Sequence, residues 1–206
     1  MIKLSIGELE EAIRDPKGHR TKAIAKTMVK PYYPISFYVQ LKNSIYRYHS
    51  SQNNPVIGEE YLTVKLAQFK SEIRKRQMFE QYYWYVNDCF SNGIQIFDWR
   101  KNITISGASA DILLTGEISR WDIRDKGGYD IWLFRKSEPD GWEKELRMPL
   151  IQDRLSTLLN SSTDEIYIGI YSFNEKYKSQ MSYSLQEINT AKQKLNSFLI
   201  NYSQLL

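Results

Sequence analysis

The first 92 residues carry apolar side chains at the three- and four-residue spacing of amphipathic helices. A Ser-x-x-Glu capping box at Ser5 predicts a short helix that ends at Asp15-Pro16, because proline cannot continue a helix. Residues 35–49 and 58–90 repeat the pattern, the second range as one long helix or as two with little break. The N-terminal part, residues 1–92, is therefore expected to be mainly helical.

From Gly93 the spacing changes to that of strands, with β-branched and aromatic residues gathered between turns. Strands are predicted over residues 94–99, 103–106, 112–123, 129–134 and 164–173. Helices are predicted over residues 145–160 and after a second capping box at Ser184. The expected fold is α/β, with a central mixed sheet of about five strands flanked by helices. No linker rich in glycine, serine or proline divides the chain, so we expect one domain over residues 1–206 with its sheet in residues 93–206.

Two of these strands form a predicted hairpin around the charged, glycine-ended turn at residues 124–128. The simplest register pairs Ile123 with Tyr129. Alternation along both strands then puts four side chains on one face of the sheet as two opposed pairs: Ser119 with Leu133, and Glu117 with Arg135.

Three motifs follow one another in this region: Gly116-Glu117-Ile118-Ser119 on the first strand, Leu133-Phe134-Arg135 on the second, and Gln152 on the helix that follows. Their order resembles the core of the PD-(D/E)XK nuclease superfamily, and within it the RecB-like branch. In that core a Gly-x-x-Asp strand precedes an Asp/Glu-x-Lys strand and a helix with a glutamine. The resemblance implies a restriction-endonuclease-like core behind an N-terminal helical segment.

Active members of that superfamily cut nucleic acid with Mg²⁺, which needs two or more converging carboxylates. Here Ser119 and Leu133 stand at the two ligand positions, and leucine cannot coordinate the ion. Arg135 keeps a positive charge but is too basic to accept a proton. We therefore expect a degenerate site without metal or cofactor. The register also predicts an ion pair between Glu117 and Arg135, either built into the fold or solvated and of little energetic consequence.

A shifted register would instead leave an active, Mg²⁺-dependent nuclease. Its site would then draw on the nearby carboxylates Glu117, Asp122, Asp130, Glu143 and Glu145. His49 is a candidate metal ligand in that case, since active RecB-like enzymes can use a histidine near this point. A surface or half-buried histidine is the alternative for that residue.

Two basic stretches are candidates for contact with nucleic acid: Lys22, Lys26 and Lys30 in the first, and Lys70, Arg74, Lys75 and Arg76 in the second. The three lysines fall at four-residue intervals, so on a helix they would form one cationic stripe. Such a stripe suits phosphate groups and is also typical of a solvated helix face. The aromatic run at residues 81–85 suits base stacking where it is exposed, and packing against the sheet or a partner protein where it is buried.

Composition narrows the chemistry further. A net charge of +4 permits a nucleic-acid partner without requiring one. The single cysteine, Cys89, excludes an internal disulfide and any multi-cysteine metal site. The chain has neither an apolar run long enough for a membrane span nor a signal peptide, so a cytoplasmic protein without a membrane partner is expected. No motif of a serine hydrolase, a phosphate-binding loop or a zinc protease is present.

The leading hypothesis is a non-catalytic subunit with a nuclease fold. It would bind nucleic acid, with DNA favoured over RNA, together with a helicase or effector protein in a DNA-processing or defence complex. The first alternative is the active Mg²⁺-dependent nuclease with migrated carboxylates. The second is a scaffold that binds only protein.

Overall fold

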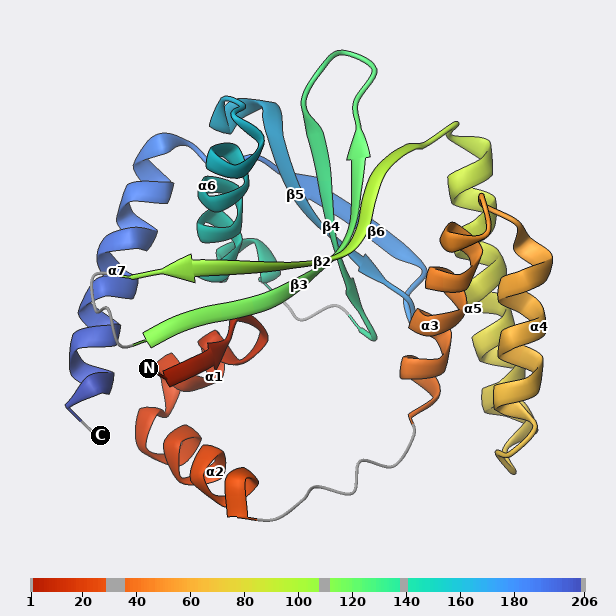
Figure 1. Cartoon of the computed structure of the whole chain (residues 1–206), viewed down its shortest axis with the longest axis horizontal. Coiled ribbons are helices and arrows are strands. Elements are labelled where there is room, and N and C mark those ends of the chain that lie inside the picture. Colours follow the sequence, from red (N-terminus) through yellow and green to blue (C-terminus); the bar gives the residue numbers. More distant parts are fainter. Residues whose placement is uncertain (1, 29–35, 108–111, 138–140, 205–206) are drawn as a thin grey trace.

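The computed structural model describes residues 2–28, 36–107, 112–137 and 141–204. In this part of the chain, six strands form one open mixed sheet, and seven α-helices lie around it (Figure 1). The strands are β1 (Ile2–Ser5), β2 (Gln95–Ser106), β3 (Ile112–Ile123), β4 (Tyr129–Arg135), β5 (Ile166–Ser172) and β6 (Tyr177–Met181). The helices are α1 (Leu9–Arg14), α2 (Pro16–Met28), α3 (Phe37–Ser50), α4 (Pro55–Leu66), α5 (Glu72–Ser91), α6 (Arg147–Leu159) and α7 (Leu185–Ser203).

The sheet is organised around β3, the strand that three others pair with. β2 runs antiparallel along one edge of β3, from Gln95 opposite Ile123 to Ser106 opposite Leu113. The other edge is shared, because β1 pairs with its first four residues in parallel and β4 pairs with its last four in antiparallel fashion. β5 then adds to β4 in parallel, and β6 closes the order as an antiparallel strand.

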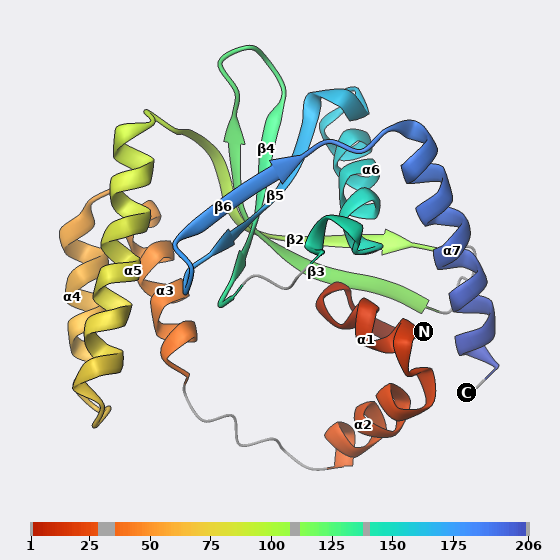
Figure 2. The ribbon, with the colours of Figure 1, turned by 180° about the vertical axis from the view of Figure 1, so that it is seen from behind.

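Each face of the sheet has its own hydrophobic cluster. One cluster joins the sheet to α1, α6 and α7, and the other joins it to α3, α4 and α5. Figures 1 and 2 show these two groups of helices on opposite sides of the strands. β4 alternates between them: Ile131 belongs to the first cluster, and Trp132 and Phe134 belong to the second. This alternation is the period of two that a sheet buried on both faces requires.

The α/β fold class is confirmed, with six strands where about five were predicted. The hairpin register is confirmed as well, from Ile123 opposite Tyr129 to Arg120 opposite Trp132. Two strands, β1 and β6, were not predicted. The two predicted strands over 94–99 and 103–106 are one strand, bent by a register shift at Phe97. The long helical range is two helices, α4 and α5, and the single domain stays a prediction.

The predicted capping box at Ser184 is confirmed, whereas Ser5 caps the chain through a different hydrogen bond from that of a capping box. Ser184 and Glu187 form the reciprocal capping box that begins α7. Ser5 accepts a bond from the backbone N–H of Gly7 and begins a 3₁₀ turn, Ile6–Glu8, which leads into α1. No helix in the described residues combines the length and the apolar character needed to cross a membrane.

Candidate functional site

The candidate site lies where the shared edge of β3 is left open. β1 pairs with β3 as far as Thr115, and β4 pairs from Arg120 onward. On that edge residues 116–119 therefore face a gap between the end of β1 and the end of β4. Gly116 suits this place, because a Cβ there would lie 2.9 Å from the Cβ of Ile6.

A pocket of about 440 Å³ fills this gap, and we call it the split pocket. Its walls come from six parts of the fold: the turn after β1, Ile103 of β2, the middle of β3, the end of β4, the start of α6 and one face of α3. The charged side chains that line it are Lys42, Glu117, Arg135, Lys136 and Arg147. Four of the five positions highlighted by the resemblance also line it: Glu117, Ser119, Leu133 and Arg135.

Glu117 is held by groups from two other elements. Its carboxylate accepts hydrogen bonds from the Lys42 ammonium (3.2 Å) and the Tyr46 hydroxyl (2.8 Å), both on α3. The Arg100 guanidinium of β2 binds the other oxygen at 3.2 Å. Burial alone would raise the pKa of Glu117, but Lys42, Tyr46 and Arg100 together hold that pKa below its usual range. The carboxylate is therefore ionised and already compensated by two cations.

The predicted ion pair between Glu117 and Arg135 is wrong. Arg135 instead makes two bonds to the carboxylate of Glu145, at 2.6 and 3.2 Å, and Arg147 binds the same carboxylate at 2.8 Å. The β3–β4 ladder ends at Trp132, so the two strands no longer hold residues 117 and 135 as cross-strand neighbours. Glu117 therefore pairs with Lys42 and Arg100, and Arg135 pairs with Glu145.

Leu133 does not share a face with Glu117 as predicted, whereas Ser119 does, since the Tyr46 hydroxyl on α3 makes hydrogen bonds with both Glu117 and Ser119. The Ser119 hydroxyl accepts a bond from the Phe134 N–H at 3.0 Å and so replaces a ladder bond where the strands separate. Leu133 packs against the cluster under α6, whereas Glu117 reaches α3. The reason is a change of alternation in β3: Ile118 and Arg120 are two residues apart, yet Ile118 faces the α6 side and Arg120 faces the α5 side.

Gln152 lies outside the split pocket and is fully buried on α6. Its amide nitrogen donates to the carbonyls of Thr163 (2.8 Å) and Tyr183 (2.9 Å), and its amide oxygen accepts the N–H of Tyr183 at 2.8 Å. These bonds connect α6 to the segments before β5 and α7. Gln152 therefore stabilises the packing of this helix.

The donor set of the split pocket does not fit Mg²⁺, the ion that the resemblance implies for active relatives. Among its described lining residues Glu117 is the one carboxylate, and two cations and a hydroxyl already bind it. A hard divalent cation prefers several oxygen ligands that are free of competing cations. Across the described residues, no group of three or more histidine, cysteine, aspartate or glutamate side chains is placed to hold a metal ion.

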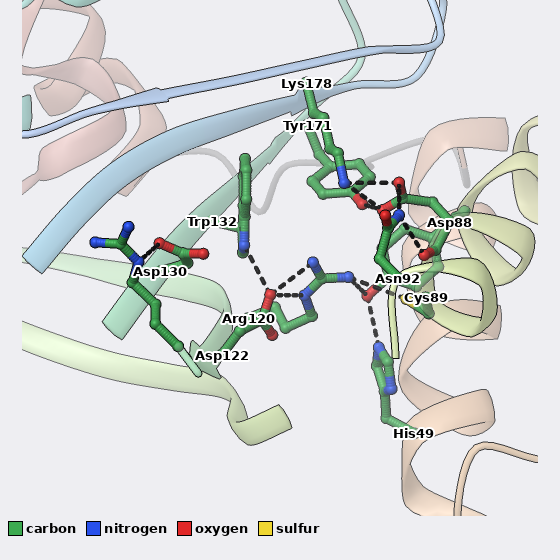
Figure 3. A network of polar contacts seen from close by, with 12 residues as sticks. His49, Asp88, Cys89, Asn92, Arg120, Asp122, Asp130, Trp132, Tyr171 and Lys178 are labelled. Atoms are coloured by element: carbon green, nitrogen blue, oxygen red, sulfur yellow. Dashed lines mark hydrogen bonds and ion pairs between the residues drawn. The ribbon is translucent and has the colours of Figure 1, made fainter. Parts of the chain in front are cut away.

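A second polar cluster lies between the hairpin and helices α3 and α5 and is centred on Arg120, whose side chain is fully buried (Figure 3). Its guanidinium donates two bonds to one oxygen of Asp122, and one each to the Tyr85 hydroxyl (2.8 Å) and the Cys89 sulfur (3.1 Å). Trp132 donates to the same Asp122 oxygen at 2.8 Å. We call this set, with His49, the buried network.

His49 belongs to the buried network and is fully engaged there. Its Nε2 lies 2.6 Å from the Tyr85 hydroxyl and its Nδ1 lies 2.9 Å from the Asn53 amide oxygen. Burial is the main reason that its pKa falls to about 4, and the nearby Arg120 charge acts in the same direction. Both ring nitrogens are used in the fold, which argues against the role of metal ligand.

The other carboxylates suggested for a migrated site are divided between separate places. Asp122 and Asp130 face each other across the hairpin, and burial raises the pKa of both. Each has an arginine partner, Arg120 for Asp122 and Arg124 for Asp130. Glu145 lies with Arg135 near the split pocket, and Glu143 lines a different pocket beside α7.

The predicted basic residues do not converge on the split pocket. Lys22 forms an ion pair with Glu11 on α1, at 2.6 Å. Lys26 is described by its backbone alone, on α2, and Lys30 lies outside the described residues. In the second stretch, Lys75 pairs with Glu72 and Arg74 stacks over Phe37, while Lys70 and Arg76 are exposed. This second stretch lies at the start of α5.

The aromatic run is mostly interior. Tyr82 and Tyr85 are fully buried, Trp84 packs against Tyr171 and Phe173, and Tyr83 is exposed. This part of α5 therefore packs against the sheet, which was one of the two predicted alternatives.

The sequence patterns did not predict the cations that surround Glu117 or the lysine at the rim of the pocket. Lys42 sits on α3, Arg100 is on the bent strand β2, and Lys136 follows β4. One signal for Lys42 was available: it lies on the predicted helix over residues 35–49, but a single lysine there has no distinguishing spacing. Their convergence depends on which helix packs beside the gap in the sheet.

Comparison with known proteins gives no family. No family model matches the sequence, and no curated protein matches it. Among solved structures, the chain is similar to the crystal structure of SSO0001, with a TM-score of 0.37 and 10% sequence identity over 87% of this chain and 82% of that one. A likeness at this level carries no argument about function.

Proposed function

We propose that this chain is a non-catalytic protein with a nuclease-like core that binds nucleic acid through the split pocket. The observation that carries the proposal is the charge at the pocket. Four cationic side chains line it, Lys42, Arg135, Lys136 and Arg147, against Glu117 as the one described carboxylate in its lining. Phosphate contact by lysine and arginine supplies most of the affinity of non-specific nucleic-acid binding.

The cations differ in how available they are to a ligand. Arg135 and Arg147 are largely covered and share Glu145, and Lys42 shares Glu117 with Arg100. Lys136 is exposed at the rim and has no ion pair with any described residue. A phosphate group would therefore meet Lys136 first, with the arginines behind it.

The non-catalytic part of the proposal rests on Glu117 and Leu133. A carboxylate that two cations already neutralise is a poor ligand for Mg²⁺, and the side chain of Leu133 has no oxygen to offer. A cytoplasmic DNA-processing or defence complex with a helicase or effector protein is the proposed setting, by association with the superfamily.

Fluorescence anisotropy with labelled single- and double-stranded DNA and RNA tests the binding. Lys136→Gln is expected to weaken binding of every strand and to reduce the slope of log affinity against log salt by about one. Lys194→Gln is the matched control, because Lys194 is an exposed lysine on α7 that does not line the split pocket.

Two results would overturn the proposal. The absence of binding at low salt would remove nucleic acid as the ligand. Metal-dependent cleavage by the wild-type protein that disappears in Glu117→Ala would make the chain an active nuclease.

A further inference from the structure

A second and larger pocket continues from the split pocket. It has a volume of about 1050 Å³ and lies between the start of α3, the first half of α5 and the turn between β5 and β6. Tyr38 and Lys136 line both pockets, so the two hollows meet at these side chains. We call this second hollow the aromatic pocket.

One wall of the aromatic pocket is built from aromatic rings. Phe37 and Phe69 lie with ring centroids 4.1 Å apart and their planes inclined by 35°. Both side chains are partly exposed and line the hollow. The Arg74 guanidinium lies 5.8 Å from the centre of the Phe37 ring. Flat, partly exposed rings beside a guanidinium are the surface on which unpaired bases stack.

The lining of the aromatic pocket also carries amide groups. They belong to Gln77, Gln81 and Asn174, and Gln81 donates to the Asn174 amide oxygen at 3.2 Å. The Glu80 carboxylate, which also lines the pocket, is paired with Lys176 at 3.6 Å. Amide side chains present both a donor and an acceptor, as the edges of nucleobases do.

A buried hydroxyl marks the junction of the two pockets. The Tyr38 hydroxyl is enclosed and has no hydrogen-bond partner among the residues that the structure describes. A buried polar atom without a partner is unfavourable, by about 1 to 3 kcal/mol in typical cases. A ligand that extends from one pocket into the other would pass this hydroxyl and could accept its hydrogen bond.

We propose that the aromatic pocket is a subsite for an unpaired nucleobase whose neighbouring phosphate group lies in the split pocket. The base stacks on the wall of Phe37 and Phe69, and its edge meets the amides of Gln77 and Asn174. A fully paired duplex offers no free base face to this wall, because its bases are stacked on one another. The subsite rests on the proposed function, since it assumes that nucleic acid is the ligand.

The test compares three labelled probes of equal length: a single strand, the same backbone without bases, and a fully paired duplex. Wild-type protein is expected to bind the single strand more tightly than the other two. Phe69→Leu keeps an apolar side chain and removes the ring, so it should weaken single-strand binding about tenfold. Binding of the strand without bases should be unchanged.

Two further variants keep the test decisive. Gln77→Ala changes an exposed residue of α5 that the fold does not need, and it should weaken single-strand binding about fivefold. Phe90→Leu is the matched control, because it makes the same substitution at a phenylalanine that is 86% exposed and lies outside the pocket. It should leave single-strand affinity unchanged. Circular dichroism checks that Phe69→Leu is folded. If Phe69→Leu does not fold, the result for Gln77→Ala decides whether the subsite exists.

The outcomes separate the subsite from the proposed function. Equal affinity of the wild-type protein for the strands with and without bases would overturn the subsite alone. Failure to bind either strand at low salt would overturn the proposed function and the subsite with it.

Discussion

The split pocket and the buried network both use a carboxylate and basic groups near the β3–β4 hairpin, but they differ in their access to water. In the pocket, the Glu117 side chain is 28% exposed and its partners Lys42 and Arg100 are 26% and 57% exposed. In the network, the Arg120 side chain is 0% exposed and that of Asp122 is 6% exposed. Glu117 and Asp122 thus lie five positions apart on one strand, yet the first carboxylate is hydrated and the second is buried.

This difference decides what each group of charges can do. A charge that is removed from water needs fixed partners, and breaking such a pair is strongly destabilising. The buried network connects α3, α5 and the hairpin through Arg120, so its charges belong to the fold (Figure 3). The charged side chains of the split pocket stay in contact with water, and a ligand can replace that water.

The largest expected effect is on stability and comes from Arg120→Met. The variant leaves the Asp122 carboxylate buried without its cation, and we expect a loss of about 3 to 5 kcal/mol in the free energy of unfolding. Urea denaturation followed by circular dichroism measures it. Replacing both partners, as in Arg120→Met with Asp122→Leu, should recover most of the loss.

The matched control for that prediction is Lys192→Gln. Lys192 pairs with Asp153 on the surface at 2.9 Å, and removal of an exposed pair costs less than about 1 kcal/mol. A loss below 1 kcal/mol for Arg120→Met as well would contradict the distinction between the two regions.

The second prediction concerns acid and the buried network. The pKa of His49 in the folded state is about 4, below its ordinary value near 6.5, so the folded protein binds fewer protons than the unfolded chain between these values. The contribution of neutral His49 to the free energy of unfolding is complete above pH 6.5 and is lost as the pH falls towards 4. We expect a decrease of up to about 3 kcal/mol in the free energy of unfolding over this range.

His49→Gln should flatten this pH dependence, because glutamine does not titrate. Urea denaturation at several pH values between 4 and 7 measures the slope for both proteins. An unchanged slope in the variant would assign the acid sensitivity to other groups.

The smallest expected effect concerns α2. Lys22 is paired with Glu11 and lies outside the lining of the split pocket, so Lys22→Gln should change nucleic-acid affinity by less than about twofold. Lys136→Gln, with the same loss of charge, should have the larger effect. Equal effects in an anisotropy titration would favour the lysine stripe of the sequence over the pocket as the binding surface.

Local patterns were enough to predict the hairpin. The turn at residues 124–128 and the alternation beside it determine the register of Ile123 with Tyr129. The capping box at Ser184 and the break at Pro16 were equally local signals. β1 was missed because four residues are too short a run to show a period, and β6 because its residues are largely polar.

The site could be predicted only in part. The sequence brought residues 117, 119, 133 and 135 to one place, and all four line the split pocket. Their partners could not be predicted, because Lys42 and Arg100 approach Glu117 through the packing of α3 and the bend of β2. The change of alternation between Ile118 and Arg120 also has no local signal, since it depends on where β4 leaves β3.

The central claim is that the split pocket holds nucleic acid without cutting it, and one measurement tests both halves. A labelled single strand is titrated in the presence of Mg²⁺ with the wild-type protein and with Glu117→Gln, and affinity and strand length are read together. We expect an intact strand in both cases and binding to Glu117→Gln that is tighter by about fivefold, because a negative charge leaves the pocket. A strand that the wild-type protein cuts and Glu117→Gln leaves intact would contradict the account.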